Sequence, residues 1–93
     1  MPLSNKTKNE SSSVQFVCMG NGLPIPDVIW QKNGLVINNS TKYFIQQTDE
    51  NNTRRTSILT IKNLKFMDRG VYSCTMRNRK DETVKNGSLV VQG

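Results

Sequence analysis

The side chains that could carry chemistry in this chain of 93 residues are two cysteines, Cys18 and Cys74, and there is no histidine. Two thiolates without an imidazole leave a zinc site short of its four ligands. The Ser–His–Asp and Cys–His arrangements for nucleophilic catalysis need an imidazole base, which this chain cannot supply. We therefore expect no enzyme activity, no metal site and no cofactor.

A second kind of chemistry is open to the asparagines, because six of the 11 stand in the N-x-Ser/Thr pattern of glycan acceptors. With Ser or Thr at 16 of 93 positions, chance alone would produce about two such patterns. This excess favours an extracellular, disulfide-permissive setting. The alternative is an asparagine-rich turn composition that carries no glycan. The candidates are Asn5, Asn9, Asn38, Asn39, Asn51 and Asn86. Because the patterns of Asn38 and Asn39 overlap, we do not expect both of these residues to be modified.

The charge of the chain indicates its partners less directly. There are 13 Lys and Arg against 7 Asp and Glu, a formal net charge of +6. This balance suits anionic partners, although solubility is the plainer explanation, and no aromatic platform for nucleic acid accompanies it. No segment approaches the roughly 20 apolar residues of a membrane span, and no N-terminal stretch resembles a signal peptide. We expect an excised domain whose signal peptide or anchor lies outside these residues.

Short segments that alternate between apolar and polar residues must position these side chains. Residues 14–18 have a period of two, which places Val14, Phe16 and Cys18 on one face of a strand. Residues 1–7 are predicted to be a polar entry, with a first strand near residues 3–8 that is short or missing. Further strands are predicted at 28–32, 35–37, 42–47, 56–64, 71–78 and 83–92. About seven or eight short strands with frequent turns predict an all-β sandwich.

Two hairpins are specified further. Asn33-Gly34 is a strong signal for a two-residue turn. The hairpin of residues 42–47 and 56–64 is predicted to turn at 49–53, with facing residue numbers that sum to about 102. In that register Tyr43 faces Leu59 on the inner side of the sheet, and Phe44 faces Ile58 on the outer side.

The spacing of a few residues resembles a known family. Trp30 stands 12 residues after Cys18, and Cys74 follows Cys18 by 56 residues. The segment before the second cysteine, Asp68-Arg69-Gly70-Val71-Tyr72-Ser73-Cys74, has the form D-x-G-x-Y-x-C. These residues resemble the signature of the immunoglobulin superfamily. Its I-set version is resembled by three further segments, Gly22-Leu23-Pro24-Ile25-Pro26, Lys32-Asn33-Gly34 and Ser57-Ile58-Leu59-Thr60-Ile61. The resemblance spans about residues 8–92, so it implies a single domain, 1–93, folded as an immunoglobulin-like Greek-key β-sandwich of two sheets.

The resemblance implies a disulfide between Cys18 and Cys74 that bridges the two sheets, with Trp30 packed against it. On the chain-entropy model such a bridge is worth roughly 4 kcal/mol, which is comparable to the whole stability of many small domains. The alternative is a pair of buried reduced thiols, as in intracellular muscle relatives of this set.

The other signature residues receive structural roles from the same resemblance. Tyr72 would bond through its hydroxyl to the backbone a few residues earlier, and Gly70 would serve where the chain turns sharply. Asp68 would be a buried acid, for which Lys42 is the best-placed basic partner. Leu59 would belong to the core.

The fold and the acceptor sites together predict a non-catalytic protein-interaction module from the ectodomain of a secreted or cell-surface receptor or adhesion protein. Its partners would be a protein ligand or neighbouring immunoglobulin domains. The alternatives are binding of heparan sulfate and a structural spacer in a tandem array. Two surfaces are candidates for the partner. The first is an exposed apolar pair, which could instead pack under a neighbouring loop or domain. The second is a basic region, which could instead be a plain solvated charge cluster. The candidate residues are Phe44 and Ile58 for the pair, and Arg54, Arg55, Arg77, Arg79, Lys80 and Lys85 for the basic region.

Overall fold

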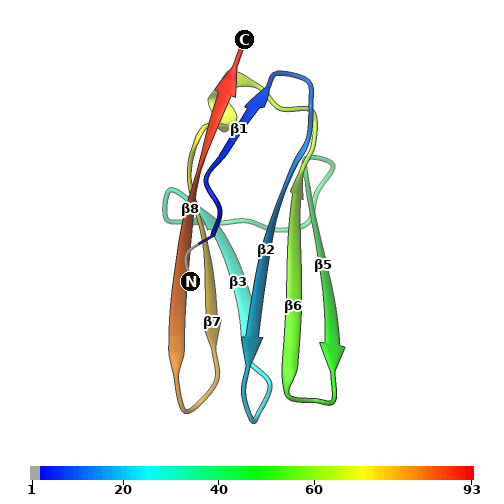
Figure 1. Cartoon of the computed structure of the whole chain (residues 1–93), viewed down its shortest axis with the longest axis vertical. Helices are drawn as coiled ribbons and strands as arrows, with labels where there is room; N and C mark the ends of the chain where they lie inside the picture. Colours follow the sequence, from blue (N-terminus) through cyan, green and yellow to red (C-terminus); the bar gives the residue numbers. More distant parts are fainter. Residues whose placement is uncertain (1–2) are drawn as a thin grey trace.

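The computed structural model of the chain describes residues 3–93, which form two β-sheets facing each other as the layers of a sandwich (Figure 1). One sheet has the strand order β1-β8-β7-β3-β4 and the other has the order β2-β6-β5. This is the all-β architecture predicted from the sequence. The elements are β1 (Lys6–Asn9), β2 (Val14–Asn21), β3 (Asp27–Lys32), β4 (Leu35–Val36), β5 (Tyr43–Glu50), β6 (Arg54–Ile61), the short 3-10 helix η1 (Phe66–Asp68), β7 (Gly70–Arg77) and β8 (Glu82–Gln92).

The core lies between the two sheets and follows the period of two that the sequence shows. In β2, Val14, Phe16 and Cys18 are buried while the residues between them are exposed. The rings of Phe16 and Tyr72 stack across the interior with their centroids 5.4 Å apart. The remaining apolar core residues are Leu3, Trp30, Ile37, Leu59, Ile61, Leu64, Cys74, Met76, Leu89 and Val91.

The start of the chain differs from the predicted polar entry. Leu3 is buried, and its N–H donates to the carbonyl of Asn86 at 3.1 Å. Gly87 makes room for this contact, because a Cβ at that position would lie 2.7 Å from the Cβ of Leu3. The first strand, β1, is short, begins only at Lys6 and pairs in parallel with β8. Leu3 therefore contributes to the core, although it is the one apolar residue among residues 3–7.

The Asn33-Gly34 turn joins β3 to β4 as predicted, with Lys32 facing Leu35. Both turn residues have positive φ, 50° and 86°, which is the backbone that this dipeptide favours. The side chain of Asn33 also accepts the N–H of Val71 at 3.0 Å. A Cβ at Gly70 would lie 2.8 Å from that same side chain, so glycine is required beside it.

The predicted register of the β5–β6 hairpin is wrong by two residues. Facing residue numbers sum to 104, so Tyr43 faces Ile61 and Phe44 faces Thr60. The strands extend to the pair Glu50–Arg54 and leave a three-residue loop, 51–53. Two asparagines of this loop have positive φ, 52° and 55°, a conformation that asparagine tolerates better than most residues. A shift of two residues keeps every side chain on its predicted face.

Candidate functional site

The bridge between the sheets is a disulfide from Cys18 on β2 to Cys74 on β7, two cysteines that are both buried. Trp30 on β3 faces Cys74 in the sheet register and is itself 1% exposed. Its indole N–H donates to the Oγ of Ser57 on β6 at 2.9 Å. The indole therefore also links the two layers, through a polar contact that is satisfied inside the core.

A second buried cluster fixes the chain before β7. The Nζ of Lys42 lies 2.6 Å from Oδ2 of Asp68, and the hydroxyl of Tyr72 donates to the carbonyl oxygen of Asp68 at 2.6 Å. The backbone N–H of Lys65 also donates to the Asp68 carboxylate, at 2.8 Å. Burial, with the neighbouring Tyr43 and Asp68, raises the pKa of Tyr72 above its ordinary value. The ion pair proposed from the sequence is thus present, and its role is structural.

The six acceptor asparagines all lie on the surface of the sandwich. Asn51 is in the loop at the tip of the β5–β6 hairpin, and Asn86 is exposed on β8. In Asn5 and Asn39 the amide oxygen accepts a backbone N–H, from Ser88 and Ile45 respectively. Those hydrogen bonds engage only the amide oxygen. The amide nitrogen, to which a glycan would be attached, takes no part in them. Each site is accessible, and modification of these residues stays a prediction.

The predicted apolar pair is not a cross-strand pair. Phe44 faces Thr60, while Ile58 faces Gln46 on one side and Val17 on the other. Val17, Met19 and Phe44 are 49%, 45% and 42% exposed, so the outer face of the three-stranded sheet still carries apolar side chains. Phe44 is partly engaged, because the Nζ of Lys62 lies 5.4 Å from the centre of its ring.

The basic residues do not form one free cluster. Arg55 donates to both carboxylate oxygens of Asp49, at 2.7 and 3.0 Å, and to the carbonyl oxygen of Pro26 at 3.0 Å. The hydrogen bond from Arg55 lowers the pKa of the Asp49 carboxyl, and Arg55 has a side chain only 17% exposed. Lys85 donates to the carbonyl oxygen of Met19 at 3.0 Å. The remaining candidates, Arg54, Arg77, Arg79 and Lys80, are exposed.

Arg55 is therefore engaged in an intramolecular ion pair with Asp49, and its place on a partner surface stays a prediction. The basic side chains that remain exposed come from the start of β6, the end of β7 and the turn that follows β7. Nothing in this arrangement supports a dedicated heparan sulfate site.

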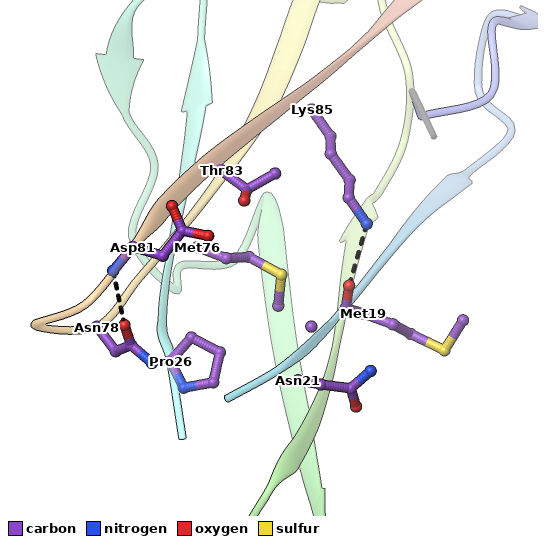
Figure 2. Close-up of a pocket in the computed structure, with 9 residues that line it drawn as sticks. Met19, Asn21, Pro26, Met76, Asn78, Asp81, Thr83 and Lys85 are labelled. Atoms are coloured by element: carbon purple, nitrogen blue, oxygen red, sulfur yellow. Dashed lines mark hydrogen bonds between the residues drawn. The ribbon is translucent and has the colours of Figure 1, made fainter. Parts of the chain in front are cut away.

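A hollow of about 220 Å³ beside β2 was not predicted from the sequence. Figure 2 shows that Lys85 crosses it from β8 to reach the backbone of Met19 on β2. Met76 and Pro26 supply apolar parts of the lining, and Asp81 is the acidic residue there. The one sequence signal was the position of Lys85, which shares the inward parity of Leu89 and Val91 on the last strand.

Residues 3–93 contain no group of three or more His, Cys, Asp or Glu side chains placed to hold a metal ion. Over the same residues, no helix has the length and apolar character needed to cross a bilayer.

Comparisons with known proteins agree with this geometry. The family model described as the immunoglobulin domain matches residues 1–78 of this chain. The chain is 32% identical over 88 residues to protein sax-3 of Caenorhabditis elegans, covering 95% of this chain and 6% of that one. It is 31% identical over 87 residues to transmembrane and immunoglobulin domain-containing protein 1 of Bos taurus, covering 94% of this chain and 31% of that one.

The chain therefore spans less than a third of the length of either relative. Among solved structures, titin domain M7 is similar with a TM-score of 0.88 and 26% identity, covering 100% of this chain and 90% of that one. The match of the family model, the disulfide across the sandwich and the buried tryptophan beside it lead to one conclusion: this chain belongs to the immunoglobulin domain family.

Proposed function

We propose that this domain is a non-catalytic protein-interaction module in the extracellular part of a secreted or cell-surface receptor or adhesion protein. The observation that carries the proposal is the combination of six exposed glycan-acceptor patterns with a disulfide in one small domain. Disulfides and N-glycans are both acquired in the oxidising secretory pathway. One relative is named as a transmembrane and immunoglobulin domain-containing protein, which supports a cell-surface parent for this domain.

The distribution of acceptor sites suits a binding role. On the five-stranded sheet, Asn86 lies on the outward side of β8, and its glycan would cover part of that face. None of the six candidates belongs to β2, β5 or β6, the strands of the other sheet. A partner could therefore reach the three-stranded sheet, whose outer face carries Val17, Met19 and Phe44.

The likeness to a structure of titin Ig tandem domains, 27% identical with a TM-score of 0.82, favours a second candidate, a structural spacer in a tandem array. A spacer needs contacts only at its two ends, whereas a binding module needs an accessible face. A binding screen with the isolated domain distinguishes the binding module from the spacer, because a spacer binds no partner through its sheets.

Secretion from animal cells behind an added signal peptide tests the extracellular assignment. We expect the secreted chain to migrate more slowly than its calculated mass and to shift down on glycosidase treatment. Ser88→Ala removes the acceptor pattern at Asn86 and leaves the asparagine in place, so it should remove one glycan step. Ser13→Ala is the matched control, since Ser13 is exposed and belongs to no acceptor pattern. A band that glycosidase leaves unchanged would count against the proposal.

A further inference from the structure

The outer face of the five-stranded sheet is uncharged at its centre, where β3, β7 and β8 lie side by side (Figure 1). The residues that alternate with the buried ones point to this face. Its central positions are Ile29 and Gln31 on β3, Ser73 and Thr75 on β7, and Val84 and Asn86 on β8. None of them is charged, although the chain has 13 Lys and Arg and 7 Asp and Glu. Depletion of charge is typical of a surface that becomes covered.

Two half-exposed valines flank the acceptor residue Asn86 on this face. Val84 stands two residues before Asn86 on β8 and is 52% exposed. Val71 on β7 is 49% exposed and faces Ser88, the residue two positions after Asn86. Val84 therefore lies about 7 Å from Asn86 along the strand, and Val71 lies about 7–8 Å away on the diagonal. A group attached to Asn86 has an apolar side chain within reach on either side.

Neutral polar groups lie between and beside these valines. Ser73 is directly opposite Asn86, and its hydroxyl donates to the side-chain oxygen of Gln31 at 3.4 Å. Thr75 and Ser88 are half-buried neighbours on the same face. Hydroxyl and amide groups can each donate and accept hydrogen bonds. A face that mixes methyl groups with such groups matches a sugar ring, which has an apolar C–H surface and a rim of hydroxyl groups.

We propose that an N-glycan on Asn86 packs against this face with its first sugar over Val71 and Val84, a proposal that rests on the function inferred above. The acceptor pattern Asn86-Gly87-Ser88 stands at the centre of the uncharged surface, so the chain itself supplies what covers it. Contact with the sugar removes the two valines from water and stabilises the fold. A protein partner on this face would have to displace the glycan, so the glycan directs partners to the three-stranded sheet.

Thermal unfolding of the secreted chain tests this packing after an endoglycosidase has trimmed every glycan to one sugar. Ser88→Ala removes the glycan from Asn86 and should lower the Tm by roughly 4–8 °C, because exposing the covered halves of two valines is comparable to exposing about one buried valine. The same two chains made in bacteria carry no glycan and give the effect of the serine itself. Thr53→Ala is the matched control, because it removes the acceptor pattern of Asn51 in the polar loop 51–53 and should leave the Tm unchanged.

Valine variants identify the surface that the sugar contacts. Val84→Thr keeps the shape of the side chain and replaces one methyl group with a hydroxyl. We expect it to lower the Tm of the trimmed glycoprotein by roughly 2–4 °C more than that of the bacterial chain. Val90→Thr is the matched control, because Val90 is outward on the same strand and 50% exposed. It lies four residues from Asn86, roughly 14 Å away, which a single sugar does not span.

The mass of the secreted chain and its peptides separates this inference from the proposed function. A secreted chain without any glycan contradicts both. A chain that is glycosylated elsewhere but not at Asn86 overturns the inference and leaves the proposed function standing. The same holds if Ser88→Ala lowers the Tm equally in the glycoprotein and the bacterial chain, or if Val84→Thr and Val90→Thr have equal glycan-dependent effects.

Discussion

Replacement of Asp68 by asparagine should be among the most destabilising changes of a single charged group in this domain. The change removes the charge and keeps the shape, so the chief loss is the ion pair with Lys42. Asp68 has a side chain that is 6% exposed, whereas that of Lys42 is 29% exposed. Removal of one partner from a fully buried pair costs about 3–5 kcal/mol.

The expected cost is lower than that range, since Lys42 can turn to water when its partner is neutral. The new amide oxygen can still accept the N–H of Lys65, which now donates to the carboxylate at 2.8 Å. We therefore expect a loss of about 2–3 kcal/mol in the free energy of unfolding. With a urea dependence of about 1–2 kcal/mol per molar, the unfolding midpoint falls by roughly 1–3 M.

Urea unfolding followed by the fluorescence of Trp30 measures this loss. Asp49→Asn is the matched control, because it makes the same chemical change at an exposed ion pair with Arg55. A further variant with both Lys42→Met and Asp68→Asn should regain part of the stability, because no uncompensated charge then remains. Equal losses from Asp68→Asn and Asp49→Asn would refute the argument that burial sets the cost.

Three other changes follow from the same structure. Replacing Cys18 and Cys74 together with alanine opens a bridge across 56 residues of sequence, and should cost about 4 kcal/mol in urea unfolding. Gly34→Ala puts a side chain at a φ of 86°, and should cost about 1–2 kcal/mol in thermal unfolding. Burial raises the pKa of Tyr72 and, less strongly, that of Tyr43 above the ordinary 10.0. The folded chain then keeps protons that the unfolded chain loses, so stability should fall as the pH rises past 10, and an absorbance titration should show both tyrosines ionising late.

The parts of the fold that the sequence predicts are those set by short-range pattern and by the family signature. Alternation of apolar residues identified the buried face of β2, and the Asn33-Gly34 dipeptide identified its turn. The D-x-G-x-Y-x-C segment indicated Asp68 and Tyr72, whose mutual hydrogen bond depends on a local chain reversal. In each case the residues that interact are close in sequence or share a strong spacing.

The parts that could not be predicted depend on register between strands. The sequence of an asparagine-rich loop does not reveal which residue lies at its centre. When the centre of the turn lies one residue later in the chain, each residue of the first strand faces a residue two positions further along the second strand. That displacement separates Phe44 from Ile58 and brings Asp49 opposite Arg55. The ion pair between Asp49 and Arg55 could therefore not be predicted from the sequence. The burial of Leu3 was missed for a similar reason, because it depends on the small size of Gly87 on a distant strand.

Peptide mapping by mass spectrometry of the chain secreted from animal cells tests the extracellular assignment most directly. Free thiols are blocked first, and a glycosidase that converts each glycosylated asparagine to aspartate is applied next. We predict aspartate at one or more of the six acceptor positions and a peptide cross-linked through Cys18 and Cys74. Six unmodified asparagines together with two blocked cysteines would contradict the account.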